Sequence, residues 1–250
     1  MGRLYKINED YFSSIVTEKQ AYLLGMLYAD GCLVKPKGNR QLKLTLCLQE
    51  EDDLATNLMA DEICPDKRPT LSYPPSVEKK GWKKRTILTV VSDKIGQDLI
   101  RLGCGIGKTE KGIQFPKINN ELVHHFIRGY FDGNGGITVD KVKNKYKRVT
   151  TWTIKNAFTD KIRKRCYFCS TDESFLAELF THLPPFKTKT QVRFKRSCYT
   201  WSIESQTAVE LLKEYLYKDA TVFLARKEKK FNMTIKSLAE DTSSEGLETT

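Results

Sequence analysis

The sequence predicts an α+β protein built from two copies of an αββαββα unit, and three observations lead to this prediction. A helix-like segment rich in small residues occurs twice, with Gly25, Leu27, Ala29 and Gly31 matching residues 104 positions later. Each copy is followed by a strand-like segment and an acidic helix start. Two alternating strands and a closing helix then end each unit. Self-similarity at this scale indicates a duplicated domain with two antiparallel sheets.

The elements of each unit can be placed in order. The first unit has a helix ending at Asp30. An acidic helix follows at 50–63, then two strands at 69–78 and 86–91, and a closing helix at 92–103. The second unit has a helix ending at Asn134. Its acidic helix follows at 171–183, its two strands at 188–195 and 198–204, and its closing helix at 205–216. The longer stretch 136–170 predicts an extended hairpin or an insertion. We therefore expect an N-terminal half at 1–104, a linker at 105–119, a C-terminal half at 120–236 and an acidic, disordered tail at 237–250.

The charge of the chain favours a polyanionic partner. Forty-two Lys and Arg stand against 31 Asp and Glu, for a net charge of +11, and 40% of the residues are hydrophobic, enough for a packed core. The bases gather with aromatic residues in strand-like segments, at 35–43, 79–85, 141–148, 161–165 and 193–196. This pattern favours nucleic acid. The sequence shows no secretory signal and no membrane span, so an intracellular protein with no membrane partner is expected.

The two helix-like segments predict a close-packed pair. Gly25 and Ala29 are four residues apart, as are Gly129 and Gly133, and small residues at this spacing let helix backbones approach closely. Positions 30 and 134 then arrive side by side at the helix ends. Polar side chains there, beside helix-end carbonyl groups, form a hard-oxygen site suited to Mg²⁺. An ordinary buried helix pair with glycine caps is the alternative.

Two other motifs are weak. Cys166 and Cys169 form a CxxC pair without a second pair or a neighbouring His, and the odd total of seven cysteines favours reduced thiols. Segment 103–109 (GCGIGKT) lacks the first glycine of a P-loop, because position 102 is Leu, and it follows a helix instead of a strand. We expect neither a zinc site nor a nucleotide site.

The segments LLGMLYADG (23–31) and IRGYFDGNG (127–135) resemble the LAGLIDADG motif, and residues 17–231 resemble the single-chain LAGLIDADG homing endonucleases. The resemblance implies a monomer with a pseudo-twofold DNA-binding saddle that hydrolyses double-stranded DNA at a long asymmetric site, for which Mg²⁺ is the expected cofactor and Mn²⁺ or Ca²⁺ can substitute in binding. It implies metal ligands at Asp30, Asn134 and the helix-end residues Ala29 and Gly133. It also implies a lysine from each half near the scissile phosphates, for which Lys108 and Lys227 are the candidates.

Strand alternation suggests which residues meet the DNA. Leu42, Leu44, Leu46 and Leu48 share one face, while residues 43, 45 and 47 point the other way, and Val192 and Phe194 alternate in the same manner with polar neighbours. Such strands can bury one face on helices and lay the other in a groove. The sheet-face candidates are Lys43, Arg85, Arg193 and Lys195, and the loop candidates are Lys35, Lys37, Arg40, Lys83, Lys141, Lys143, Lys147, Arg148 and Arg196.

One departure from the motif bears on activity. The second copy carries Asn134 where the motif has an acid, and an amide lacks the charge that holds a divalent cation. Asp132 lies about 200° away around the helix, too far to replace it. We therefore expect impaired cleavage or nicking of one strand. Two alternatives stay open: a DNA-binding protein that does not cleave, and an intron RNA maturase with the same fold.

Overall fold

The computed structural model describes residues 5–38, 41–72, 83–149, 154–187, 191–195, 197–235 and 237, and it confirms the predicted α+β fold. The first half begins with α1 (Glu18–Asp30), whose N-terminus is capped by Thr17 in a capping box with Gln20. The other elements of this half follow in chain order: β1 (Gly31–Val34), β2 (Lys43–Gln49), η1 (Glu50–Asp52), α2 (Asp53–Ile63), β3 (Thr70–Ser72), β4 (Arg85–Val91), α3 (Asp93–Arg101) and the short α4 (Lys108–Lys111).

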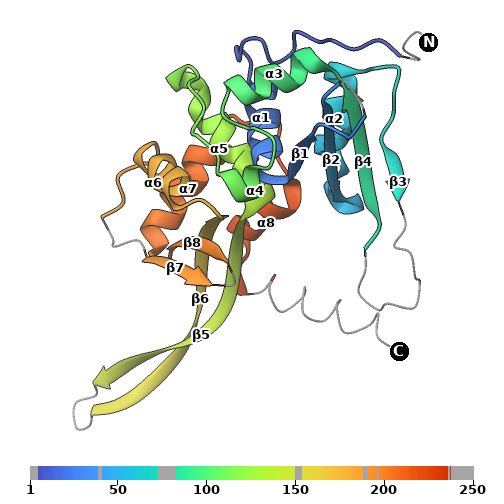
Figure 1. Ribbon diagram of the computed structural model, residues 1–250. Helices are drawn as coiled ribbons and strands as arrows, with labels where there is room; N and C mark the ends of the chain where they lie inside the picture. Colours follow the sequence, from blue (N-terminus) through green and yellow to red (C-terminus); the bar gives the residue numbers. More distant parts are fainter. Residues whose placement is uncertain are drawn as a thin grey trace.

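The second half repeats this order with longer first strands. It consists of α5 (Asn120–Asn134), β5 (Gly135–Val149), β6 (Ile154–Ser170), α6 (Glu173–Thr181), β7 (Gln191–Lys195), β8 (Cys198–Ile203), α7 (Gln206–Tyr217) and α8 (Ala225–Asn232). The stretch predicted as an extended hairpin is the β5–β6 pair. It projects well beyond the body of the protein (Figure 1). The predicted tail at 237–250 lies outside the described residues except for residue 237.

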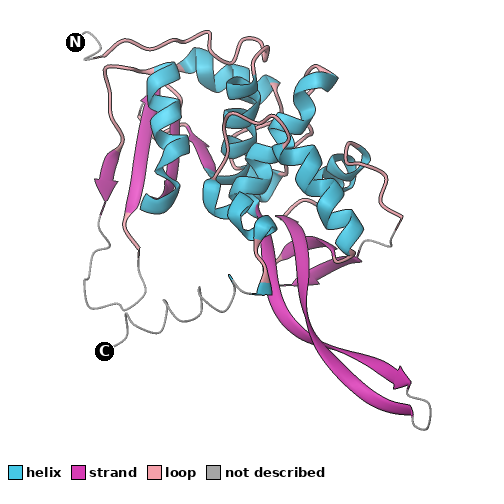
Figure 2. Ribbon diagram, turned by 180° about the vertical axis from the view of Figure 1, so that it is seen from behind, coloured by secondary structure: helices cyan, strands magenta, loops and turns pink. Residues whose placement is uncertain are grey.

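Both sheets are antiparallel and have the same topology. Their strand orders are β1-β2-β4-β3 and β5-β6-β8-β7, so each strand of the first sheet has a counterpart at the same place in the second. Helices α1, α2 and α3 pack on the first sheet, and α5, α6, α7 and α8 pack on the second. The helices form the centre of the molecule and the sheets lie on its flanks (Figure 2).

Strand alternation determines which face of each sheet the helices cover. In β2 the leucines at 44, 46 and 48 are buried, and Lys43, Thr45 and Cys47 are only partly covered, as the sequence predicts. In β6 Cys166 and Phe168 are buried, and the residues that alternate with them, Arg165, Tyr167 and Cys169, lie on the open face. The expectation is wrong for β7, where Val192 and Phe194 remain 43% and 64% exposed. β7 is an edge strand, so its apolar side chains extend beyond the helical cover.

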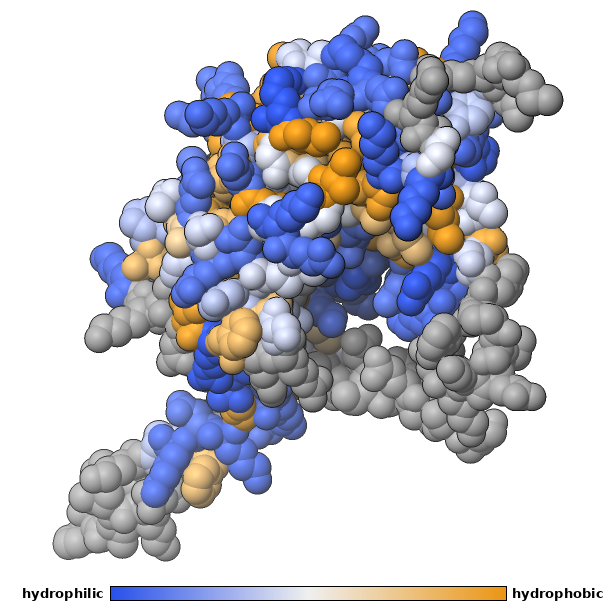
Figure 3. All heavy atoms as spheres, viewed as in Figure 1, coloured by the Kyte–Doolittle hydropathy of each residue, from blue (hydrophilic) through white to orange (hydrophobic). Residues whose placement is uncertain are grey.

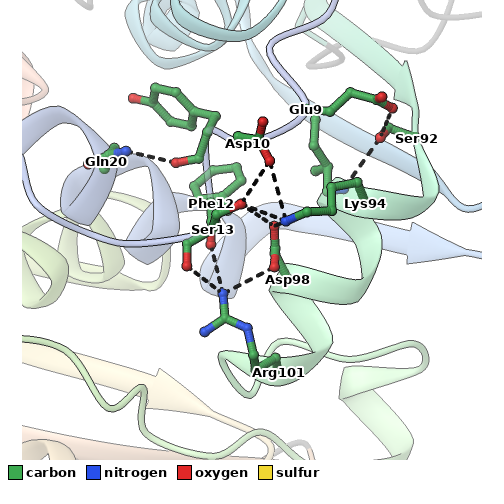
Figure 4. A network of polar contacts seen from close by, with 11 residues as sticks. Glu9, Asp10, Phe12, Ser13, Gln20, Ser92, Lys94, Asp98 and Arg101 are labelled. Atoms are coloured by element: carbon green, nitrogen blue, oxygen red, sulfur yellow. Dashed lines mark hydrogen bonds and ion pairs between the residues drawn. The ribbon is translucent and has the colours of Figure 1, made fainter.

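The segment before α1 is tied to α3 by polar contacts. Ser92, the N-cap of α3, donates a 2.6 Å hydrogen bond to Glu9, and Arg101 donates to the carbonyl groups of Phe12 and Ser13 (Figure 4). These contacts close the first half around its buried leucines. None of the helices in the described part of the chain has the length and apolar run needed to cross a bilayer.

Candidate active site at the helix ends

Helices α1 and α5 cross in backbone contact at two glycines. A Cβ atom at Gly25 would lie 2.0 Å from the carbonyl oxygen of Phe126, and one at Gly129 would lie 2.1 Å from that of Tyr22. No side chain can occupy either position without moving backbone. The two contacts are reciprocal, because Tyr22 and Phe126 are at matching positions of the duplicated motif. The structure thus places the predicted helix interface at the pseudo-twofold axis.

The carboxylate of Asp30 lies where this helix pair ends. A Cβ atom at Gly133 would be 2.2 Å from the Cβ of Ala29 and 2.8 Å from Oδ2 of Asp30. The end of α1 therefore contacts the end of α5, and Asp30 lies beside the residue that precedes Asn134. The crossing brings together the four positions that the sequence analysis proposed around the metal.

A lysine from each half binds the end of the matching helix. Lys108 Nζ donates to the carbonyl groups of Leu27, Tyr28 and Ala29 at 2.9, 2.7 and 2.9 Å. Lys227 Nζ donates to the carbonyl groups of Phe131 and Gly135 at 2.8 and 2.5 Å. Lys108 satisfies the Tyr28 and Ala29 carbonyls that the helix end leaves unpaired, whereas the Leu27 and Phe131 carbonyls also accept from the amides of Gly31 and Gly135. The charge of both ammonium groups complements the helix dipole. Each lysine is thus held within the helix pair and beside the candidate site.

The charges at the site influence one another. Desolvation by the surrounding protein raises the pKa of Asp30, and the ammonium groups of Lys108 and Lys227 lower it in part. Burial lowers the pKa of Lys108, and it lowers the pKa of Lys227 to about 8. An ammonium group with such a lowered pKa is poorly hydrated, so a phosphate that approaches it gains a strong electrostatic interaction.

Asn134 lines a cavity of about 210 Å³ between the second sheet and the connection of the halves. Ala29, Lys108 and Tyr130 line the same cavity, with Cys169, Ser170 and Cys198 from the sheet. The Tyr130 hydroxyl donates a 2.6 Å hydrogen bond to the carbonyl group of Cys169, which fixes one wall. No sequence motif connects β6 and β8 to the helix ends, so these wall residues could not be predicted.

Asp132 does not replace the missing acid. The residue is 1% exposed, and its carboxylate accepts hydrogen bonds from the Tyr22 and Tyr217 hydroxyls and the Leu224 amide at 2.8–2.9 Å. Tyr28, at the matching position of α1, donates to the carbonyl groups of Leu102 and Gln114. Both side chains thus anchor the segments that flank the lysines. Asp132 faces the interior, and it cannot replace the missing acid, as the helical geometry predicts.

An ion pair between the halves lies close to the site and was missed by the sequence analysis. Arg226, at the start of α8, donates from Nε and Nη2 to the two carboxylate oxygens of Asp52, each at 2.5 Å. Asp52 is 5% exposed. The pair is close enough to Asp30 and Lys227 to influence the pKa of each. Arg226 precedes Lys227 in the chain, so this contact fixes α8 against the first half.

The open faces of the two sheets differ in charge. In the described strands of the first sheet, the only bases on this face are Lys43 and Arg85, at opposite ends of the β2–β4 pair. The register of the second sheet places seven bases on its open face: Arg148, Lys155, Lys161, Arg163, Arg165, Arg193 and Lys195. The surface of the projecting hairpin is mostly hydrophilic (Figure 3). The two sheets thus offer unequal positive surfaces.

The remaining candidates for DNA contact fall into three groups. Lys35, Lys37, Lys83, Lys141 and Lys143 are exposed, and Lys83 and Lys141 form ion pairs with Glu51 and Asp160 at 2.8 and 2.9 Å. Only the backbone is described for Lys147, Arg148 and Lys195. Arg40 and Arg196 lie outside the described residues. By register, Lys141 and Lys143 share the face of Ile137, opposite to the arginines of β6.

The donors at the helix ends fit a divalent cation that keeps most of its water. Asp30 provides a carboxylate and Asn134 an amide oxygen, and Mg²⁺ commonly takes one or two protein ligands while water and substrate phosphates complete its shell. The Ala29 carbonyl, a predicted ligand, instead accepts from Lys108. The described residues contain no group of three or more His, Cys, Asp or Glu able to hold a metal. The charge of such a site therefore depends on Asp30.

Comparisons with known proteins agree with this geometry at the level of the fold. No family model and no curated protein matches the sequence. The LAGLIDADG meganuclease I-AabMI, solved bound to uncleaved DNA, is 12% identical with a TM-score of 0.53 and 92% coverage of both chains. The homing endonuclease I-WcaI, solved bound to its DNA recognition sequence, is 16% identical with a TM-score of 0.52, covering 91% of this chain and 94% of that one. The chain therefore has the fold of the single-chain LAGLIDADG homing endonucleases.

Proposed function

We propose that this chain is a site-specific endonuclease for double-stranded DNA that acts as a monomer on a long asymmetric site. The observation that carries the proposal is the meeting of Asp30, Asn134, Lys108 and Lys227 at the ends of two glycine-packed helices, between two sheets with open faces. A duplex laid along both sheets passes the helix ends. Because the two halves differ in sequence, such a protein reads a non-palindromic target.

Each group at the helix ends has a role in phosphodiester hydrolysis. Asp30, with Asn134, holds a divalent cation, and Mg²⁺ bound there supplies charge neutralisation at the scissile phosphate and lowers the pKa of bound water. Lys108 and Lys227 are fixed on the helix carbonyls, so their ammonium groups stabilise the charge that develops on each strand. Both lysines are placed before substrate arrives, which reduces the reorganisation required in the transition state.

Asn134 weakens the second half of this site. The amide retains an oxygen donor but has no charge, and Asp132 cannot substitute because three hydrogen bonds hold it in the interior. We therefore propose that the chain binds its target normally and cleaves it slowly, or cuts one strand faster than the other. A DNA-binding protein that does not cleave is the second candidate, and Asn134 is the observation that favours it.

The experiment compares this chain with Asn134→Asp and Asp30→Asn. A selection for bound duplexes first identifies the target, and cleavage of that duplex with Mg²⁺ then scores nicked and linear products separately. We expect Asn134→Asp to raise the rate of linear product at least tenfold, since loss of one ligand at a metal site often costs that much. Asp30→Asn should reduce both products to background.

Three outcomes would decide against parts of this proposal. Equal rates of linear product for the parent and Asn134→Asp would remove the impaired-site hypothesis. Cleavage that survives Asp30→Asn would place the active site elsewhere. Binding with no cleavage by either the parent or Asn134→Asp would establish the DNA-binding protein, and a preference for intron RNA over the duplex would favour the maturase.

A further inference from the structure

We propose that the two halves of the DNA target differ in base composition, and this inference depends on the proposed DNA-binding function. The half-site under the second sheet contains guanines that Arg163 and Arg165 recognise. The half-site under the first sheet is rich in A·T pairs, which uncharged side chains contact through thymine methyl groups. The specificity-determining residues are those on the open faces of β2, β4 and β6.

Carboxylates on neighbouring strands hold the two arginines of β6. Asp140 on β5 lies directly opposite Arg163 on β6. Nη2 of Arg163 is 3.4 Å from Oδ2 of Asp140. Nε of Arg165 is 2.9 Å from Oε1 of Glu204, which follows β8. The arginine side chains remain 48% and 33% exposed. The carboxylates restrain the two guanidinium groups by charge, and each guanidinium keeps further N–H groups for two-point recognition of a base edge.

The spacing of these arginines matches the spacing of bases. Residues two apart in a strand lie on one face, about 6.6 Å from each other, and stacked base pairs are about 3.4 Å apart. Arg163 and Arg165 can therefore reach base pairs about two steps apart in one major groove. Arginine binds O6 and N7 of guanine through two hydrogen bonds. Guanines at this separation are the predicted targets.

Charge favours base contacts over phosphate contacts for these two residues. Each guanidinium is paired with a carboxylate, so the pair has no net charge to attract the backbone. The carboxylates of Asp140 and Glu204 would also repel a phosphate. Toward a G·C pair the same carboxylates are favourable, because Asp and Glu accept hydrogen bonds from the cytosine amino group. The arginine and the carboxylate of each ion pair thus both favour a G·C base pair.

The first sheet presents a different chemistry in the same place. The central rows of its β2–β4 pair consist of Thr45 across from Thr89 and Cys47 across from Ile87, none of them charged. The hydroxyl groups of Thr45 and Thr89 are 3.2 Å apart and satisfy each other. Their methyl groups, with the Ile87 side chain and the Cys47 thiol, provide an apolar surface. Such surfaces contact the thymine methyl group in the major groove.

The test is a binding selection from duplexes randomised across both half-sites, with EDTA present so that no strand is cut. The enriched duplexes should show guanine on one side of the centre and A·T pairs on the other. Arg163→Gln and Arg165→Gln should each reduce the preference for guanine at one position about tenfold or more, without affecting the other half-site. Arg165→Lys keeps the charge but loses the planar fork of N–H donors, so it should weaken the same preference by less than Arg165→Gln does.

Two variants serve as controls. Arg101→Gln removes an arginine paired with Asp98 on α3, away from the open faces, and should leave the selected sequences unchanged (Figure 4). Arg85→Gln should alter only the A·T-rich side. Failure to bind any duplex would overturn the proposed function together with this inference. Selected targets with equal composition on both sides, or guanine preferences unchanged by Arg163→Gln and Arg165→Gln, would overturn the inference and leave the DNA-binding function standing.

Discussion

The two halves of the molecule have the same architecture but differ at their surfaces. Both have the same strand order, the same glycine contact and a lysine on the carbonyl group of Leu27 or its counterpart Phe131. They differ in the first strand pair, where β5 and β6 have 15 and 17 residues against 4 and 7 in β1 and β2. They also differ in the charge of their open faces. The backbone contact at the axis has stayed alike, whereas single side chains beside it, such as Leu24 and Arg128, and the regions that extend from the axis have diverged.

The largest predicted effect is at a buried group that only one half has. Arg128 is 0% exposed and binds Glu18 together with the carbonyl groups of Leu216 and Val222, whereas the matching position in α1 is Leu24. Arg128→Leu should lower the free energy of unfolding by about 3–5 kcal/mol, because it leaves Glu18 and two carbonyls without their partner. Urea denaturation measures this loss.

The control for Arg128 is Arg68→Leu, because the side chains of Arg68 and its partner Asp61 are 67% and 58% exposed and the pair should contribute less than about 1 kcal/mol. A loss of similar size for both variants would mean that the buried network contributes no special stability.

The next effect should be equal in the two halves. Gly25→Ala and Gly129→Ala each force a Cβ atom into a carbonyl group of the facing helix, and we expect each to cost about 1–3 kcal/mol, toward the upper end of that range. Gly105→Ala enters open space and should be neutral. Thermal unfolding of the three variants measures the difference. Unequal losses of stability at Gly25 and Gly129 would show that the two contacts differ in energy although their geometry is symmetric.

A smaller effect is expected on the projecting hairpin, which the first half lacks. Lys161 is exposed on the open face of β6, the face that carries Arg163, and it should neutralise about one phosphate. Replacing it with Gln should reduce the slope of log affinity against log salt by about 1. The matched control replaces Lys213 of α7. Fluorescence anisotropy on one duplex measures both slopes, and identical slopes for the two variants would remove the hairpin from the interface.

The smallest effect is a pH dependence at Lys227. Burial lowers its pKa from 10.5 to about 8 in the folded protein, so the unfolded chain binds more protons between these values. The contribution of this group to the free energy of unfolding therefore increases as pH rises from about 8 to 10.5. The stability difference between the parent and Lys227→Met should be larger at pH 9.5 than at pH 7. A difference that is constant or smaller at pH 9.5 would contradict the lowered pKa.

The sequence predicted features that depend on local patterns. The repeat at Gly25 and Gly129 indicated the helix pair, and the alternation around Leu44 and Leu46 indicated which face of β2 is buried. Helical geometry also indicated that Asp132 points away from position 134 and cannot replace the missing acid. Each of these inferences needs only the period of one element and the duplication of the motif.

Features that depend on contacts between distant segments could not be predicted in this way. Asp52 and Arg226 are 174 residues apart, and neither belongs to a motif. Glu18 also belongs to no motif, although its carboxylate binds Arg128 and Thr221. The exposure of Phe194 depends on where the helical cover of the sheet ends. Such properties follow from tertiary packing, and one-dimensional patterns do not contain them.

The network around Arg128 also determines which halves can associate with each other. By the 104-residue offset, Glu18 corresponds to Leu122 and Arg128 to Leu24. In a dimer of two second halves, each Arg128 would face Leu122 instead of Glu18. In a dimer of two first halves, each Glu18 would face Leu24 instead of Arg128. The second-half homodimer therefore has two uncompensated buried guanidinium groups, the first-half homodimer has two half-buried carboxylates without their guanidinium, and the mixed pair keeps the ion pair. If the chain were divided in the 105–119 connection, the fragments should assemble only as a heterodimer, a property suited to recombining halves of different specificity.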